Sequence, residues 1–306
     1  MGLALIFPGQ GAQEPGMGNG LLDAGSPGNE LARDASDVVN LDLVRLACEG
    51  TADELRATEV AQPLLLLHSV ALLQLVPPGA VASAVAVAGH SLGEYTALVA
   101  AGSLGWQDAI RLVHERGQAM AQASAPDQGM SAVLALDPPA VQATIEANGA
   151  EGAVAVVANI NAPGQVVISG HRAELERLEG PLKAAGARRV IPLQVGGAFH
   201  SPLMAGAAER LASAISSAPV TAGRPQAFNV DGAVRTAPGE IQEALRRQLT
   251  ETVRWVACVQ TLGALGVDRF VELGPGSTLA GLGKRIMPDA AWESAATAAA
   301  SKEVSN

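Results

Sequence analysis

An apolar run leads directly into a G-x-S-x-G motif within residues 85–95, which read VAVAGHSLGEY. The small and β-branched residues before Gly89 predict a buried strand, and the residues after Gly93 predict a helix. A serine at such a tight strand-to-helix turn has its hydroxyl clear of the backbone, as a nucleophile requires. The pattern therefore predicts a nucleophile elbow at Ser91, although a glycine turn capped by a serine would give the same letters.

The composition is that of a compact globular chain with few charges. Of its 306 residues, 48% are hydrophobic and 16% are charged, so the chain can bury a large core in one or two domains. The formal net charge of −10 argues against a nucleic-acid or anionic-membrane surface, because either partner requires clustered Lys and Arg. Small molecules and other proteins remain as partners. Cys48 and Cys258 are too few for a disulfide framework or a metal cage, which indicates a reducing compartment.

Two apolar segments predict core elements and not targeting or membrane segments. No positively charged start precedes an apolar run at the N-terminus, and residues 1–7 predict a strand instead of a signal peptide. The most apolar run, residues 64–76, is too short to span a bilayer and carries His68 and Gln74. We therefore expect a buried helix here, in a cytoplasmic protein without membrane contact.

The order of the expected elements divides the chain into a large and a small domain. After a Pro- and Gly-containing break at 126–129, the pattern is strand, helix, two strands, helix, strand. This order predicts a ferredoxin-like domain at 127–194. It is inserted into a large α/β-hydrolase-like domain with a parallel sheet, formed by 1–126 and 195–293. Residues 294–306 are rich in Ala and Ser without an apolar stripe, and we expect them to form a disordered tail.

His200 is the histidine whose position best suits a base for Ser91, because it lies in a glycine-rich loop at the junction of the two domains. The other four histidines have helix, turn or elbow positions that need no catalytic role: His68, His90, His114 and His171. Between Ser91 and His200, Asp108, Asp127 and Asp137 lack the strand-end setting of a third triad member. A dyad oriented by another group is the simpler interpretation.

Arg116 borders the apolar stripe of a helix predicted to start at Trp106. A guanidinium in that position requires an anion. The anion is either a carboxylate elsewhere in the fold or the carboxylate of a substrate, and spacing alone leaves both open.

Seven segments, taken together and in order, resemble the malonyl-CoA:acyl carrier protein transacylase family. They are FPGQGAQ (7–13), QP (62–63), GHSLGEY (89–95), ERG (115–117), NAPGQ (161–165), GAFHS (197–201) and ELGPG (272–276). The resemblance covers residues 2 to about 288. Each motif is weak by itself, and the resemblance depends on their number and spacing.

This resemblance implies a discrete acyltransferase of fatty-acid or polyketide synthesis that works by ping-pong transfer. Ser91 would attack malonyl-CoA with His200 as base, and the malonyl group would then pass to the phosphopantetheine thiol of an acyl carrier protein. The backbone N–H groups of Gln10 and Leu92 would hold the oxyanion. No cofactor and no metal are implied.

The same resemblance assigns the substrate site. Arg116 would bind the free carboxylate of malonate, Gln62 would line the pocket, and the backbone carbonyl of Gln248 would orient His200. The remaining expected substrate-site residues are Phe199, Gly197 and Asn161.

Three alternatives stay open. Gly197 stands where modular synthases of the family often carry a histidine, which indicates a roomier pocket and allows a methylmalonyl or ethylmalonyl group. A serine thioesterase on the same elbow would use water as acceptor and gives no reason for Arg116. A non-catalytic subunit that binds carrier protein would retain Ser91 only as a turn residue.

Overall fold

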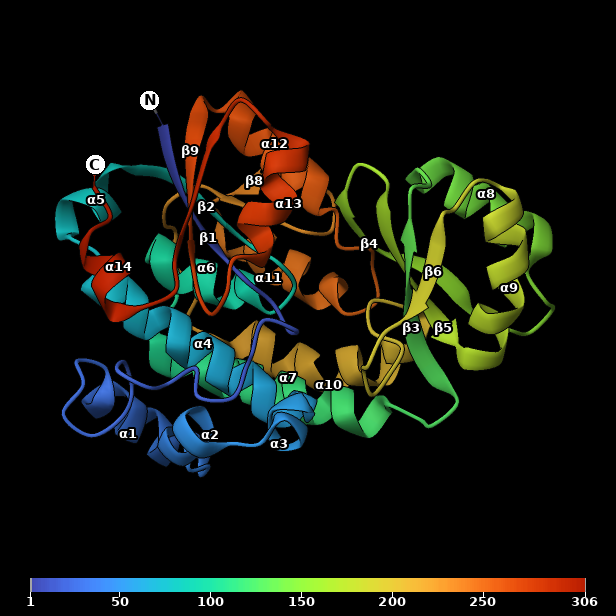
Figure 1. Cartoon of the computed structure of the whole chain (residues 1–306). Helices are drawn as coiled ribbons and strands as arrows, with labels where there is room; N and C mark the ends of the chain where they lie inside the picture. The colour runs from blue at the N-terminus through green and yellow to red at the C-terminus, as the bar shows by residue number, and fades with distance from the viewer. Residues whose placement is uncertain (1, 306) are drawn as a thin grey trace.

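The structure, a computed structural model, describes residues 2–305 and contains two α/β units (Figure 1). The large unit has a six-stranded sheet with the strand order β10-β9-β1-β2-β7-β8. Neighbouring strands are parallel except for β7 and β8. The strands are β1 (Gly2–Phe7), β2 (Ala84–Gly89), β7 (Gln226–Ala227), β8 (Val234–Arg235), β9 (Val267–Leu273) and β10 (Ala291–Ala295).

The central strands of this sheet are buried on both faces. In β1, alternate side chains enter two separate cores: Leu3, Leu5 and Phe7 face one, and Ala4 and Ile6 face the other. Helices α12 (Trp255–Ala264) and α13 (Thr278–Ile286) supply the second core, and the other helices of the large unit supply the first. Apolar residues on both faces are what a parallel sheet covered by helices requires.

The helices of the large unit precede, connect and follow its strands (Figure 1). They are α1 (Asn29–Val39), α2 (Leu43–Glu49), α3 (Ala52–Arg56), α4 (Thr58–Leu75), α5 (Pro78–Ser83), α6 (Gly93–Ala101), α7 (Trp106–Ala123), the 3₁₀ turn η1 (Pro202–Met204), α10 (Ala205–Ser217), α11 (Pro238–Gln248), α12 (Trp255–Ala264), α13 (Thr278–Ile286) and α14 (Ala298–Lys302).

Helix α4 confirms the buried helix expected from the most apolar run. Among residues 2–305 it alone is long and apolar enough to cross a membrane, with 18 residues and a mean hydropathy of 1.2, but 72% of it is buried inside the fold. It therefore serves as a core helix. It begins at Thr58, and Pro63 lies inside the helix.

The small unit is a four-stranded antiparallel sheet with the order β4-β5-β3-β6 and its own apolar core. Its elements are β3 (Gln128–Leu134), α8 (Pro138–Asn148), β4 (Ala155–Ala162), β5 (Gln165–His171), α9 (Arg172–Ala184) and β6 (Arg189–Pro192), and all lie inside the predicted range 127–194. This is the predicted βαββαβ order. The fold class, a large α/β unit with a mostly parallel sheet and an inserted ferredoxin-like unit, is confirmed.

The prediction of a disordered tail from residue 294 is wrong. Strand β10 pairs in parallel with β9 along the edge of the large sheet, and Trp292 stacks on Phe270 with ring centroids 4.0 Å apart. Thr297 then caps α14 by accepting a hydrogen bond from the N–H of Ala300. The segment has no helical stripe, and it is instead held by the pairing of β10 with β9 and by the contact of Trp292 with Phe270.

Candidate active site

Ser91 lies in a tight turn between β2 and α6 and has a positive φ of 51°. Only glycine fits at the positions two residues before and two residues after Ser91. A Cβ at Gly89 would lie 1.9 Å from the carbonyl carbon of Gly93, and a Cβ at Gly93 would lie 2.2 Å from the carbonyl oxygen of Phe7. The two glycines of the motif therefore permit the close approach of strand, turn and helix that exposes the hydroxyl.

His200 forms the expected dyad with Ser91. The Ser91 Oγ lies 2.8 Å from His200 Nε2, and His200 Nδ1 lies 2.9 Å from the backbone carbonyl oxygen of Gln248. Because a carbonyl only accepts, Nδ1 carries the proton and Nε2 is free to accept the serine proton. Burial, together with the charge of Arg116, lowers the pKa of His200 to about 3, so the imidazole is neutral at neutral pH and its Nε2 is unprotonated.

Arg116 extends from α7 into the same site and is only 1% exposed. Its Nη1 donates to Gln62 Oε1 at 2.8 Å, and its Nη2 donates to Gln248 Oε1 at 2.9 Å and to Ser91 Oγ at 3.0 Å. Within residues 2–305 no carboxylate lies in ion-pair distance of this guanidinium. Burial lowers its pKa, which reflects the cost of holding this charge inside the fold. Of the two anions left open by the sequence, the carboxylate of a ligand is therefore the better fit.

The expected oxyanion donors flank the nucleophile. Leu92 follows Ser91 directly, and Gln10 lines the same cavity from the loop after β1. In the described part of the chain neither backbone N–H has a hydrogen-bond acceptor. The N–H of Ser91 itself is engaged, since it donates to Asn229 Oδ1 at 2.6 Å. Two preorganised donors are thus free to stabilise a developing negative charge.

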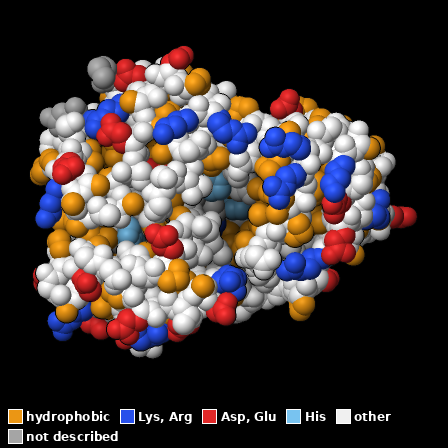
Figure 2. Space-filling view, viewed as in Figure 1, with side chains coloured by type: hydrophobic (Ala, Val, Ile, Leu, Met, Phe, Trp, Pro, Cys, Tyr) orange, Lys and Arg blue, Asp and Glu red, His pale blue; other side chains and the backbone are white. Residues whose placement is uncertain are grey.

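A cavity of about 190 Å³ connects these groups between the two units. Figure 2 shows histidine side chains inside the hollow between the two halves of the molecule. The large unit contributes Gln10, His90, Ser91, Met120, Phe199 and His200, and the small unit contributes Met130, Asn159, Asn161 and Val167.

Comparison with known proteins identifies the family to which this geometry belongs. The acyl transferase domain family matches residues 4–302. The chain belongs to this family. It is 40% identical to the malonyl CoA-acyl carrier protein transacylase of Bacillus subtilis, over 93% of this chain and 90% of that protein. It is 41% identical to the corresponding protein of Escherichia coli K12, over 93% of this chain and 92% of that protein.

Solved structures agree with the sequence comparison. An acyl carrier protein S-malonyltransferase from Vibrio cholerae has a TM-score of 0.94 with 38% identity and covers 100% of both chains. A malonyl-transacylase solved in complex with a type II PKS acyl-carrier protein has a TM-score of 0.92 with 37% identity and covers 98% of both chains. The family resemblance read from the motifs is confirmed.

His90 of this acyltransferase has a contact that the sequence did not predict. Its Nε2 lies 2.8 Å from Asn161 Oδ1, so the elbow of the large unit and β4 of the small unit meet across the cavity. The ring also lies 5.7 Å from the ring of Trp255, and burial lowers the pKa of His90. A neutral imidazole that donates from Nε2 fits both observations.

Gly197 does not enlarge the pocket, in contrast to the expectation from the sequence. A Cβ at this position would lie 2.1 Å from Ser124 Oγ and 3.1 Å from the Phe199 ring. The Ser124 side chain at the end of α7 therefore occupies the space that a larger residue would take. Phe199 borders the cavity, whereas Gly197 does not.

Two buried polar residues behind the elbow escaped the sequence analysis: Glu94 and Asn229, both 0% exposed. Asn229 follows β7, which is two residues long and gives no periodic signal. The one available clue was the turn-forming pair Asp231-Gly232 just after it, in a stretch that is otherwise apolar.

Proposed function

We propose that this acyltransferase transfers a malonyl group from malonyl-CoA to the phosphopantetheine thiol of an acyl carrier protein, through an acyl-Ser91 intermediate. The observation that carries the proposal is the position of Arg116. A buried guanidinium that contacts the Ser91 hydroxyl and has no carboxylate of residues 2–305 within ion-pair distance suits an acyl group that ends in a free carboxylate. The malonyl transferases to which the chain is similar support the same substrate.

In the first half of the proposed reaction, Ser91 Oγ attacks the thioester carbonyl and His200 Nε2 takes its proton. The C–O bond forms as the carbonyl electrons move to oxygen, where the N–H groups of Gln10 and Leu92 stabilise the charge. The intermediate then collapses, the C–S bond breaks, and the imidazolium returns the proton to the departing thiolate of coenzyme A.

The second half repeats these steps with the carrier thiol as nucleophile. His200 takes the thiol proton while sulfur attacks the acyl-serine, and the same proton then returns to Ser91 as its oxygen leaves. The backbone carbonyl of Gln248 holds His200 in the required tautomer throughout. As proposed, the reaction uses these side chains and the two thiol carriers without a cofactor. Among residues 2–305 no cluster of three or more potential metal ligands occurs.

The pocket geometry favours malonyl over a branched extender unit. Met120, Phe199 and Leu193 border the cavity with apolar side chains, and Ser124 fills the space beside Gly197. A single methylene in such a pocket changes transition-state binding by about 1–3 kcal/mol, so we expect a preference and not an absolute exclusion.

A mass spectrum of the acyl-enzyme tests this proposal. The protein is mixed with equal concentrations of malonyl-, methylmalonyl- and acetyl-CoA, quenched, and the modified peptide is identified. We expect a malonyl ester on Ser91, its loss on addition of a holo carrier protein, and no ester on the Ser91→Ala variant. A wild-type protein that gains no acyl group from any of the three thioesters would contradict the proposal. Rapid hydrolysis unaffected by carrier protein would indicate a thioesterase.

A further inference from the structure

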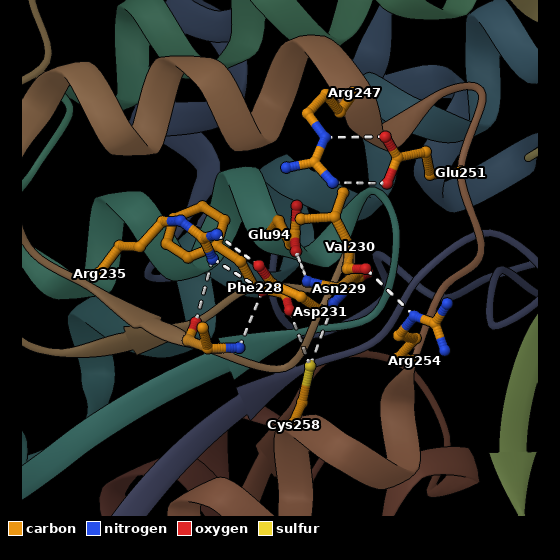
Figure 3. Close-up of polar contacts among 11 residues, drawn as sticks. Glu94, Phe228, Asn229, Val230, Asp231, Arg235, Arg247, Glu251, Arg254 and Cys258 are labelled. Carbon is orange, nitrogen blue, oxygen red and sulfur yellow. Dashed lines mark hydrogen bonds and ion pairs between the residues drawn. The ribbon is translucent and has the colours of Figure 1, made fainter.

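Glu94 is a buried carboxylate that lies directly behind the nucleophile and that the proposed reaction does not use. It is the second residue of α6 and is 0% exposed. Its Oε1 accepts a hydrogen bond from the backbone N–H of Asn229, and its Oε2 accepts one from Gln248 Nε2. Figure 3 shows the carboxylate pointing toward the backbone of Asn229. A buried carboxylate is costly, and both of its oxygens are engaged by these two residues.

Asn229 carries the effect of Glu94 to the backbone of the elbow. Its Oδ1 accepts from the N–H of Ser91 at 2.6 Å, and its Nδ2 donates to the carbonyl oxygen of Gly89 at 2.8 Å. These contacts brace both sides of the turn. Ser91 has a left-handed backbone that non-glycine residues rarely adopt, so the surrounding contacts must hold it there.

Gln248 carries the effect of Glu94 to the base and to the arginine. Its Nε2 also donates to the carbonyl oxygen of Ser91 at 2.8 Å, and its Oε1 accepts from Arg116 Nη2 at 2.9 Å. Its backbone carbonyl accepts from His200 Nδ1 at 2.9 Å. One residue therefore contacts the nucleophile, the base and the guanidinium.

The hydrogen-bond donors around Glu94 fit an ionised carboxylate, because both of its oxygens accept from N–H groups. Arg116 and Arg235 are the cations that face it, and Arg235 is already paired with Asp231. Burial raises the pKa of Glu94 to about 8, although the N–H of Asn229, the side-chain amide of Gln248 and the charge of Arg116 each act against that rise. A protonated carboxyl would present an O–H to Asn229 N–H or Gln248 NH₂, and both of these are donors.

We propose that Glu94 is a positioning residue for acyl transfer: by fixing Asn229 and the amide orientation of Gln248, it sets the alignment of Ser91 with His200. The inference rests on the proposed function only in taking Ser91 as the nucleophile. Glu94 does not touch substrate. It acts through two neighbours on the groups that do.

The Glu94→Gln variant separates this role from simple space filling. Its amide NH₂ would meet the donor of either Asn229 or Gln248, because one carboxylate oxygen becomes a donor. If the Gln248 amide turns over to accept, its NH₂ faces the Arg116 guanidinium, and the acceptor for Arg116 is lost. The variant keeps the shape of the side chain but not the hydrogen-bond pattern.

The matched control is Glu272→Gln. Glu272 in β9 is also 0% exposed, and its two oxygens accept from the N–H groups of Leu279 and Ala280 at 3.1 and 2.8 Å. It has no hydrogen bond to the dyad. The control therefore removes an equally buried carboxylate from the same unit without touching the elbow.

The primary measurement is the second-order rate at which a fluorophosphonate probe labels Ser91, because this reaction requires the dyad but no malonyl group. We expect Glu94→Gln to lower that rate about tenfold or more, since a misalignment of about 1 Å can cost two orders of magnitude. The labelling rate of Glu272→Gln should stay within about twofold of the wild-type rate, even if its melting temperature falls as far as that of Glu94→Gln. In malonyl transfer, Glu94→Gln should lower kcat more than it raises KM.

Glu94→Asp keeps the charge but is one methylene too short to reach both partners, so its labelling rate should lie between those of wild type and Glu94→Gln. If Glu94→Gln fails to fold, Glu94→Asp decides alone: slower labelling by a folded variant supports the inference, and a wild-type rate overturns it. Wild-type labelling by folded Glu94→Gln also overturns it. If the wild-type protein reacts with the probe but accepts no malonyl group, the proposed function fails while the test of Glu94 still stands.

Discussion

The two units line the active-site cavity with different kinds of side chain. The large unit contributes a connected set of buried polar groups, among which Ser91, His200, Arg116 and Gln248 are joined by hydrogen bonds of 2.8–3.0 Å. The small unit contributes the apolar side chains of Met130, Val167 and Leu193, together with Asn159, Asn161 and Gln194, whose side chains are polar but uncharged.

Strand direction accounts for this difference. Gln10, Ser91 and Asn229 all come just after the carboxyl ends of strands in the parallel part of the large sheet, namely β1, β2 and β7. In parallel sheets these ends meet at one edge, where ligands bind. The antiparallel sheet of the small unit has no such edge, and it offers Asn161 from its outer strand β4. We infer that the large unit performs the chemistry and the small unit closes and shapes the cavity.

Among the variants that test this division between the two units, His200→Ala in the large unit should lower activity the most. Loss of the general base should lower the rate of Ser91 acylation about 10²- to 10⁴-fold. Rapid-quench mass spectrometry with malonyl-CoA measures that rate, and His114→Ala, a histidine on the outer part of α7, serves as control. Acylation of the His200 variant at more than a tenth of the wild-type rate would mean that another group takes the serine proton.

Arg116→Ala should have the next largest effect and should act on substrate choice. Removing a charged donor to a carboxylate costs about 1.5–3 kcal/mol, so kcat/KM for malonyl-CoA should fall about ten- to hundredfold. The rise in KM should erase the preference over acetyl-CoA. Arg111→Ala is the matched control, because Arg111 lies on the same helix but is exposed and paired with Asp108. If Arg116→Ala kept the wild-type preference for malonyl-CoA over acetyl-CoA, Arg116 would not be the group that binds the carboxylate.

The sequence predicted those parts of the site that a local pattern or a family motif encodes. The elbow at Ser91 follows from its two glycines, and the contact of His200 with the Gln248 carbonyl follows from the family resemblance. The βαββαβ order of the small unit likewise follows from local periodicity and turns. Each of these features depends on residues close in sequence or on motifs already linked by the family.

What the sequence missed depends on contacts between distant segments. Asn229 reaches Ser91 from 138 residues away, after a strand too short to show a period. The fit of Gly197, in the loop after β6, depends on Ser124 at the C-terminal end of α7, so the absent side chain suggested space that does not exist. The terminal strand β10 forms because it can pair with the edge of β9. The composition of the tail gives no information about that pairing partner.

A third expected effect concerns stability and a buried histidine of the large unit. Burial lowers the pKa of His68 from 6.5 to about 4, and its Nδ1 has no partner in the described structure. Because the unfolded chain takes up the proton first, the stability tied to a neutral His68 is present above pH 6.5 and is lost as the pH falls toward 4.

His68→Leu removes this titration and leaves an apolar side chain in the core. Its free energy of unfolding should therefore fall less than that of wild type between pH 7 and pH 5, by about 2 kcal/mol. Urea unfolding at both pH values measures the difference, and data at pH 8, where the imidazole is neutral in both states, supply the baseline. Parallel loss of stability in the two proteins would show that His68 does not titrate in this range.

The smallest effect is expected on the side of the small unit, from Asn161→Ala. The variant removes the acceptor for His90 Nε2 and leaves a half-buried N–H without that partner beside the elbow. One neutral hydrogen bond contributes about 0.5–1.5 kcal/mol, so kcat/KM for malonyl-CoA should fall about two- to tenfold, without loss of the preference over acetyl-CoA. Asn148→Ala is the control, because the side-chain amide of Asn148 donates within its own helix α8, to the carbonyl oxygen of Thr144. If Asn161→Ala lowered kcat/KM as much as His200→Ala, Asn161 would have to contact the reacting groups. The inference that only the large unit performs the chemistry would then be wrong.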